Sequence, residues 1–202
     1  MTTRTDRAGA VYVWVSPGAG LDGFWMMRTP VTNAMWHRAV QAGAVAIPPQ
    51  PAGAFDVARR ARHPVVYVRR SMARAYAAWV GGRLPRDDEW TRAACGDDAR
   101  RYPWGNQPPD ATRANCRPHG PDDTTPVGSY PAGASAYGLL DLAGNVWELV
   151  DTPAGSGRGV VARGGSFAEY AAGVLCTARL DIDDDASRAS YSNVGVRVVH
   201  VG

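Results

Sequence analysis

Three cysteines, Cys95, Cys116 and Cys176, are the residues best suited to redox or soft-metal chemistry. An odd number without regular spacing is not a disulfide framework, and the sequence has no Cys-x-x-Cys step. We therefore expect reduced thiols and a cytoplasmic protein. The four histidines have no metal-ligand spacing and no evident Ser or Cys partner, so they do not indicate a catalytic site.

An acidic run near the C-terminus is the densest group of charged side chains. Asp181, Asp183, Asp184 and Asp185 fall within five positions. Such a run is usually a solvated loop. It could alternatively bind a cation or select a positively charged partner, because an electronegative surface attracts ligands of opposite charge.

Composition excludes several classes of function. The net charge is +3, and the basic side chains are all Arg and are scattered along the chain. Nucleic-acid binding needs a clustered basic face, so we do not expect it. No apolar run approaches the ~18 residues of a membrane helix, and the polar first ten residues resemble no signal peptide. We expect residues 1–10 to be disordered and 11–202 to form one domain.

Three segments have helical spacing of apolar residues. The first begins after a cap at Thr32 or Asn33, the second after a cap at Ser71, and the third covers about Asp87 to Cys95. Short strands are predicted elsewhere by apolar and β-branched runs. The strands expected are Val11–Val15, Phe24–Met27, Pro64–Val68, Trp147–Val150, Val160–Arg163 and Val194–Val201.

Residues 96–131 are rich in Gly, Pro, Asp and Asn but also contain aromatic residues such as Tyr102 and Trp104. A structureless loop of this length is unusual in a compact domain. The buried aromatics favour an ordered coil over disorder. The chain is therefore predicted to be α+β, with two or three early helices, a long ordered coil and short antiparallel strands.

Six groups of short motifs follow one another along the chain. They are Pro30–Ala34, Gly82–Pro85 with Glu89–Trp90, Tyr102–Asn106 with Ala114–Asn115, Thr125–Pro131 with Tyr137–Glu148, Arg163–Phe167 and Asn193–Arg197. Single motifs are weak, but six in the right order are specific. Together they resemble the sulfatase-modifying-factor family, which includes the formylglycine-generating enzymes. The resemblance covers about residues 11–201 and implies a C-type-lectin-like fold.

The resemblance also implies what this chain lacks. In the family's oxidases a pair of cysteines follows the Gly-Gly-Ser turn and binds copper through soft thiolates. The matching positions here are Glu169 and Val174, which cannot replace two thiolates. Cys176 lies nearby, without a second cysteine in its segment, and we interpret it as a buried structural thiol. We therefore expect neither copper binding nor formylglycine formation.

The family's calcium site does have counterparts. The matching ligands are the side chains of Asp141 and Glu148 and the backbone carbonyls of Gly144 and Val146. Calcium accepts six to eight such oxygens. The resemblance thus implies a structural calcium ion. The alternative is that Glu148 only accepts hydrogen bonds from backbone amides. A second family site at Asn115 lacks matching partners, although Asp122 and Asp123 could substitute.

We interpret the chain as a binding module for an unknown protein or small molecule, and a cationic ligand is one option. In this fold the segment 167–193 borders the ligand face. A metal-dependent oxidative enzyme of a biosynthetic pathway and an accessory domain of a larger complex remain alternatives. The predicted ligand-binding residues are Phe167, Glu169, Tyr170, Asp181, Asp183, Asp184, Asp185, Tyr191 and Asn193.

One specific version of the binding module is a variable protein of a diversity-generating retroelement. Those proteins carry their diversified segment at the C-terminal end of this fold, ending at a Gly-aromatic-Arg motif. This chain has Gly195-Val196-Arg197 instead, without the aromatic residue. The retroelement version therefore stays a hypothesis that the genomic neighbourhood would decide.

Overall fold

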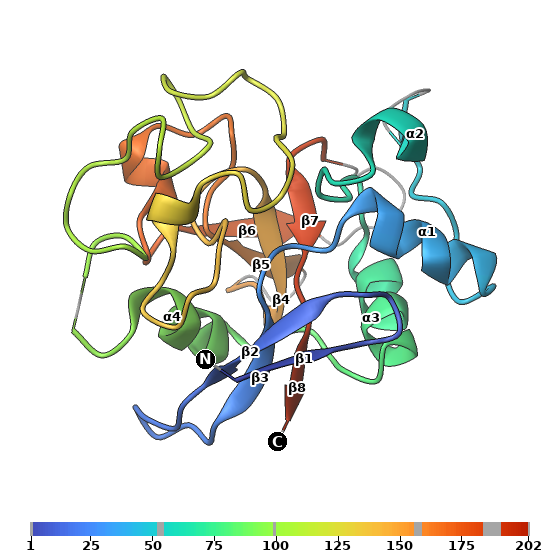
Figure 1. The fold of residues 1–202 in the computed structure, drawn as a ribbon, viewed down its shortest axis with the longest axis horizontal. Coiled ribbons are helices and arrows are strands. Elements are labelled where there is room, and N and C mark those ends of the chain that lie inside the picture. The colour runs from blue at the N-terminus through green and yellow to red at the C-terminus, as the bar shows by residue number, and fades with distance from the viewer. Residues whose placement is uncertain (1, 52–54, 99, 156–158, 184–190, 202) are drawn as a thin grey trace.

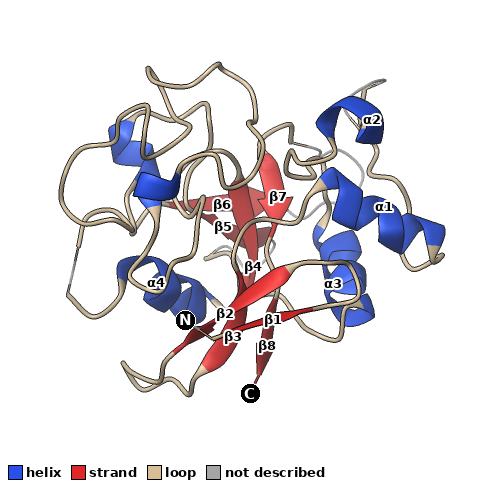
Figure 2. Cartoon of the chain, in the orientation of Figure 1, coloured by secondary structure: helices blue, strands red, loops and turns tan. Residues whose placement is uncertain are grey.

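Two four-stranded sheets form the centre of the molecule, with helices on the sides and long loops over one end (Figures 1 and 2). The computed structural model describes residues 2–51, 55–98, 100–155, 159–183 and 191–201. Four α-helices are present in these ranges, which confirms the predicted α+β class. None of the helices described has the length and apolar character required to cross a bilayer.

The first sheet has the strand order β1-β2-β3-β8 and is antiparallel throughout. It consists of β1 (Thr3–Thr5), β2 (Val11–Val15), β3 (Phe24–Met27) and β8 (Val199–Val201).

Strand β1 lies within the residues expected to be disordered, and the turn that follows it explains the difference. Asp6 Oδ1 accepts hydrogen bonds from the backbone N–H groups of Ala8 and Ala10, at 2.8 and 3.0 Å. Tyr12 Oη donates to Asp6 Oδ2 at 2.9 Å, which ties the turn to β2. A single polar side chain therefore orders a segment that has no hydrophobic pattern.

The second sheet has the order β6-β5-β4-β7. Its members are β4 (Trp147–Pro153), β5 (Gly159–Arg163), β6 (Arg179–Asp183) and β7 (Val194–Val196). The β4–β5 and β5–β6 pairs are antiparallel, whereas β4 and β7 are parallel, a pairing that the sequence pattern did not predict. Strand β6 was also not predicted, because its residues alternate charged and apolar side chains within the acidic run.

The C-terminal apolar run, predicted as one strand, is divided between the two sheets. Val194–Val196 pairs with β4, and Val199–Val201 pairs with β3. Arg197 lies at the division and is completely buried. Its guanidinium donates to both carboxylate oxygens of Glu148 on β4 and to the Met27 carbonyl on β3. The buried cation therefore joins the two sheets at the point where the chain passes between them.

The helices begin at residues whose neighbours or side chains satisfy their first N–H groups. The bounds are α1 (Asn33–Gln41), α2 (Val57–Arg60), α3 (Arg70–Trp79) and α4 (Asp87–Cys95). Thr32 caps α1 by accepting from Met35 N at 3.2 Å, as predicted. The predicted cap of α3 is wrong: Ser71 lies inside the helix, and Arg69 is the N-cap without a side-chain cap bond. Helix α2, capped by Asp56, was not expected.

Aromatic side chains of the helices form the interior. Trp36 of α1 stacks on Tyr76 of α3 with ring centroids 5.1 Å apart. Trp90 of α4 belongs to a second apolar cluster, which β2, β3 and β5 share. Pro64–Val68, predicted to be a strand, contributes buried valines to the core but forms only an isolated bridge between Pro64 and Thr32. Its proline prevents a continuous ladder because it has no N–H to donate.

The long coil is ordered, as predicted, by buried side chains. In its described residues the coil has no helix or strand before the 3₁₀ turn Pro131–Gly133. Tyr102 stacks on Trp104 with centroids 5.1 Å apart, and Tyr102 packs with Cys116 and Val174 in a small apolar cluster. Val174 ends a second 3₁₀ turn, Ala171–Val174. The coil therefore has its own core beside the two sheets.

Candidate functional site

Four polar or amphipathic side chains are hydrogen-bonded into one group at the ends of β4, β5 and β7. Glu169 Oε1 accepts from the Trp147 indole Nε1 at 3.3 Å. Asn193 Nδ2 donates to Ser166 Oγ at 3.1 Å, and the Asn193 carbonyl accepts from Trp147 N at 2.8 Å. We call Trp147, Ser166, Glu169 and Asn193 the polar group. Segments distant in sequence meet here because β4 and β7 are parallel and begin side by side.

The turn after β5 presents Ser166 to this group. Gly164 and Gly165 have φ values of 93° and 75°, a region that residues with a side chain rarely adopt. A Cβ atom on Gly165 would lie 2.3 Å from the Gly173 carbonyl oxygen, and one on Gly164 would lie 2.9 Å from the Trp90 ring. The Gly-Gly step is therefore required both by backbone conformation and by close packing.

Aromatic residues stand within two positions of members of the polar group in the sequence. Tyr170 and Tyr191 are 64% and 40% exposed, and Phe167 is half-buried. The Tyr191 carbonyl accepts from Tyr67 N at 3.0 Å. Tyr67 has φ = 61°, an uncommon conformation for a bulky residue that often marks functional sites. Nothing in the sequence pattern pointed to Tyr67.

The described part of the acidic run lies apart from the polar group, at the opposite edge of the second sheet. Asp181 is exposed on β6, the strand at the far edge of the sheet from β7. Its carboxylate pairs with Arg179 Nε at 3.3 Å and accepts from Gly155 N at 3.2 Å. Asp183 takes part in β6 through its backbone, and Asp184 and Asp185 lie outside the described residues. Phe167, Glu169, Tyr170, Tyr191 and Asn193 thus form one region, and Asp181 belongs to another.

Three of the predicted calcium ligands lie in a buried loop, and the fourth, Glu148, lies near the start of β4. Asp141 and Gly144 have positive φ, and the Asp141 carboxylate accepts from Gly128 N at 2.7 Å. Both oxygens of Glu148 accept from Arg197, at 2.6 to 3.0 Å, and Oε2 also accepts from Trp90 Nε1 at 2.7 Å. The partners of Glu148 are therefore side-chain donors and not the backbone amides considered above.

Burial governs the chemistry of Asp141. The pKa of Asp141 is raised to about 6, mainly by desolvation and also by the nearby Glu148, whereas Gly128 N–H and Arg197 oppose the change. No group of three or more His, Cys, Asp or Glu side chains that could hold a metal occurs among the described residues. A cation at Asp141 would therefore take most of its oxygens from backbone carbonyls.

The fold gives Cys176 a neighbouring thiol that its own segment does not contain. Cys176 is buried, as predicted, but its thiol interacts with that of Cys95, the last residue of α4. Cys116 is buried elsewhere, within the core of the coil. The two cysteines lie far apart in the chain, so only the fold brings them together.

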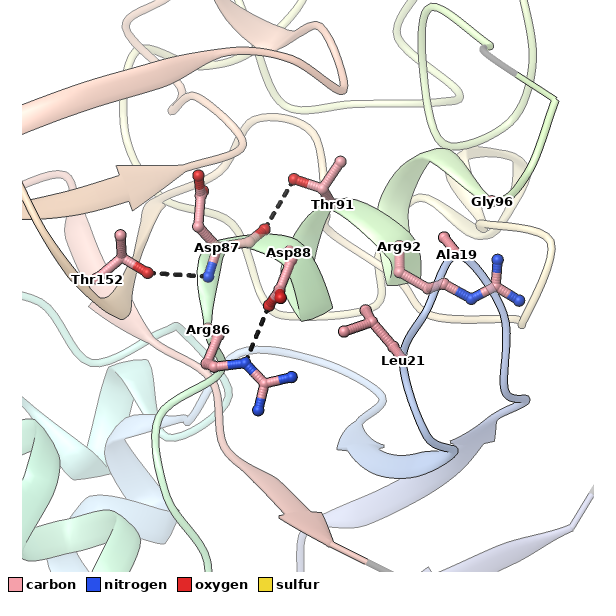
Figure 3. A pocket seen from close by; sticks show the side chains of 9 residues that line it. All are labelled: Ala19, Leu21, Arg86, Asp87, Asp88, Thr91, Arg92, Gly96 and Thr152. Carbon is pink, nitrogen blue, oxygen red and sulfur yellow. Dashed lines mark hydrogen bonds and ion pairs between the residues drawn. The ribbon is translucent and has the colours of Figure 1, made fainter.

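A separate cavity of about 520 Å³ lies between α4 and the loop that joins β2 to β3 (Figure 3). Asp88, Thr91 and Arg92 line it from the helix, and Ala19 and Leu21 line it from the loop. Its charged side chains are largely paired within the protein: Arg86 Nε donates to Asp88, and Arg92 donates to the Ser16 and Pro17 carbonyls. The cavity was not predicted, because its residues come from segments that carry no common motif.

Sequence reasoning also missed two members of the polar group. Trp147 was expected only in the core, and Ser166 only as part of a turn. Trp147 is 5% exposed, so its apolar ring does belong to the core while its indole N–H reaches Glu169. Both residues lie in the motifs that carry the family resemblance, and that was the available signal.

Comparison with known proteins identifies the family. A family model described as the sulfatase-modifying factor enzyme 1-like domain matches residues 16–201. The chain therefore belongs to this family, as the resemblance implied.

Similar proteins include enzymes and a variable protein. The chain is 35% identical to a hercynine oxygenase of Mycolicibacterium thermoresistibile over 86% of its length and 46% of that protein. It is 36% identical to a formylglycine-generating enzyme of Thermomonospora curvata over 72% of its length and 50% of that enzyme. It thus spans about half the length of these relatives. The structure of Treponema denticola variable protein 1 superposes with a TM-score of 0.74 at 17% identity, covering 100% of this chain and 99% of that one, which supports the fold alone.

Proposed function

We propose that this chain is a ligand-binding domain of the sulfatase-modifying-factor family and that the polar group is its binding site. The observation that carries the proposal is the hydrogen-bonded connection of Trp147, Ser166, Glu169 and Asn193. Two exposed tyrosines, Tyr170 and Tyr191, stand within two positions of Glu169 and Asn193 in the chain. Such convergence of a few polar groups beside aromatic side chains is typical of small-molecule and peptide sites.

The chemistry of the group favours a ligand with a positive charge or several hydrogen-bond donors. Glu169 is half-buried, and one of its oxygens already accepts from Trp147. A carboxylate held in this way attracts a cation, and exposed tyrosine faces can add cation–π contacts. Hercynine is one compound to test, because relatives of this chain are named hercynine oxygenases.

A binding experiment tests this proposal. We expect isothermal titration to detect binding of hercynine or of a basic peptide, and no binding of an acidic peptide. Glu169→Gln keeps an acceptor for Trp147 but removes the charge, so it should weaken binding about tenfold or more, equivalent to the roughly 1.5–3 kcal/mol of a charge-assisted hydrogen bond. Asp181→Asn is the matched control, because it removes a carboxylate from the opposite edge of the sheet. An equal loss of binding affinity in both variants would indicate general electrostatic attraction and would contradict the proposal that the polar group is the binding site.

We also propose that this chain does not oxidise cysteine with copper. The family's two thiolate positions correspond to Glu169, which accepts from Trp147, and to Val174, which is fully buried. The expected result is that a cysteine-containing peptide incubated with the protein and copper gains no formylglycine by mass spectrometry. Turnover would refute this part of the proposal.

A structural calcium ion is proposed at Asp141 with the backbone carbonyls of Gly144 and Val146. Glu148 would contribute only if it shared its carboxylate between the ion and Arg197. The ion would offset the cost of burying an ionised Asp141 and would order the loop. Calcium should raise the melting temperature of the wild type but not of Asp141→Asn. Equal shifts in both proteins would argue against this site.

An oxidative enzyme is the second candidate function, because 86% of the chain aligns with a hercynine oxygenase. Since that relative is about twice as long, this domain would then act as one part of a larger catalyst. Iron or copper retained through purification, together with oxygen consumption on addition of a thiol and hercynine, would favour this function over simple binding.

The likeness to Treponema denticola variable protein 1 supports the retroelement version of the binding module at the level of fold alone. The test is genomic. A neighbouring reverse transcriptase and a near-copy of the DNA that encodes the C-terminal segment are expected if the segment is diversified, and their absence would remove this version.

A further inference from the structure

The thiols of Cys95 and Cys176 form a buried pair outside the polar group. Cys95 ends α4, and Cys176 lies in the segment between the 3₁₀ turn Ala171–Val174 and β6. Both belong to the same apolar cluster, and they are 9% and 1% exposed.

Backbone and arginine contacts hold the two segments together. Cys176 N donates to the Arg101 carbonyl at 2.8 Å, which fixes its segment against the chain that leaves α4. Arg163 Nη2 donates to the Cys176 carbonyl at 3.0 Å and to Thr91 Oγ1, one turn before Cys95, at 2.8 Å. The pair is thus positioned by a shared arginine as well as by the apolar packing of both side chains.

The electrostatic surroundings differ for the two sulfurs. The Cys176 thiol, and then Arg163 and Arg100, lower the pKa of Cys95 against the opposing effect of burial. The Cys95 thiol and burial raise the pKa of Cys176. The direction of these changes makes Cys95 the more readily ionised of the two thiols, and disulfide formation requires one thiolate and one thiol.

The cavity of Figure 3 extends to the residue that follows Cys95. Asp88, Thr91 and Arg92 line it from α4, and Gly96 lines it as well. Cys95 lies at helical spacing after the first three of these residues but does not itself line the cavity. At 9% exposure against 1%, Cys95 is the more exposed of the two cysteines.

We propose that Cys95 and Cys176 are a redox-active dithiol that hydrogen peroxide converts to an intramolecular disulfide. The Cys95 thiol first loses its proton, and the thiolate attacks one peroxide oxygen. The O–O bond breaks to give Cys95 sulfenic acid and hydroxide, and the hydroxide takes up the released proton to form one water. The Cys176 sulfur then displaces the hydroxyl group from Cys95, releasing a second water. In sum, two thiols and one peroxide give one disulfide and two waters, and a dithiol reductant reverses the change.

The disulfide would join the end of α4 to the segment that follows Glu169 and Val174 in the chain. Oxidation would therefore restrain the region next to the polar group. The inference stands on the cysteine geometry alone and does not depend on the proposed ligand-binding function.

Cys116 provides an internal control. It is fully buried, and burial raises the pKa of Cys116 to about 11 without a contribution from another thiol. Cys116 should therefore remain reduced under the conditions that oxidise the pair.

The test uses the full chain, reduced and then freed of reductant. After treatment with peroxide, we expect denatured protein to accept one alkyl group instead of three, and the digest to contain one peptide pair linked through Cys95 and Cys176. The thermal midpoint should rise on oxidation and return with dithiothreitol, because a cross-link restrains the unfolded chain.

Variants assign the roles. Cys116→Ser should oxidise like the wild type, whereas Cys176→Ser should accumulate a sulfenic acid at Cys95 that dimedone labels. The inference is overturned if all three thiols of the peroxide-treated wild type remain alkylatable, or if the bond found involves Cys116 or a second molecule. The wild-type peptide map decides the question even if a variant fails to fold.

Discussion

Replacing Arg197 by Met should destabilise the protein more than any other single loss of charge in the described structure. Arg197 is completely buried, and its guanidinium donates to Glu148 and to the carbonyls of Met27 and Leu140, at 2.6 to 3.0 Å. The methionine fills similar space but donates nothing. Glu148, itself 0% exposed, would remain as a buried carboxylate whose sole partner is the Trp90 indole.

The magnitude follows from the two kinds of group left without partners. Removing one member of a buried ion pair costs about 3–5 kcal/mol. Two buried carbonyls that lose their donors add to this cost, at roughly 1–3 kcal/mol each when fully unsatisfied, although the chain will relax to recover part of it. We therefore expect a loss of about 4–5 kcal/mol in the free energy of unfolding. Against a typical total of about 5–15 kcal/mol, the variant should be marginally folded or unfolded at 37 °C.

A double-mutant cycle separates the charge from the packing. In Glu148→Gln/Arg197→Met the buried negative charge is absent and Trp90 can still donate to the Gln oxygen. The double variant should therefore be more stable than Arg197→Met by about 2 kcal/mol or more. Urea unfolding followed by tryptophan fluorescence measures each corner of the cycle.

An exposed arginine gives the control. Arg74 pairs with Asp151 while its side chain is 52% exposed. Arg74→Met should cost no more than about 1 kcal/mol. If Arg197→Met costs as little as Arg74→Met, or if the double variant is less stable than Arg197→Met, the account of a buried cation that joins two sheets is wrong.

Three further predictions concern the turn, a histidine and a tryptophan. Gly165→Ala should cost roughly 2–3 kcal/mol in urea unfolding, because a Cβ there meets the Gly173 carbonyl and φ is positive; a neutral effect would show that the turn relaxes. Burial, and then the Arg60 charge, lower the pKa of His63 from 6.5. Neutral His63 should therefore contribute fully to the free energy of unfolding above pH 6.5, and this contribution should be lost as the pH falls through that value. His63→Gln should reduce the loss between about pH 7.5 and 5.5. Trp90→Phe should cost about 1.5–3 kcal/mol through the lost indole bond to Glu148, and no loss would mean that this bond contributes little.

Local chemistry allowed much of the fold to be predicted. Apolar residues at helical spacing located α4 at Asp87–Cys95, and the side chain of Thr32 marked the start of α1. Short runs of apolar residues marked β2 and β3 with the correct bounds. These signals are short-range, since capping and hydrophobic periodicity depend on residues a few positions apart.

The candidate site was predicted only in part. Glu169 and Asn193 followed from the position of the family motifs, and the structure does place them together. The same reasoning added Asp181, which lies on the other edge of the sheet, because nearness in sequence does not fix which strands become neighbours.

By itself, the sequence determined the family, the α+β class, the helices with strong periodicity and the glycines that the turn after β5 requires. Only the tertiary structure decided where the C-terminal valines divide between two sheets, that Arg197 is buried against Glu148, and that Cys95 meets Cys176. These outcomes depend on pairing between segments far apart in the chain. Their free energy comes from burial and partner choice in three dimensions, and no local pattern of residues records it.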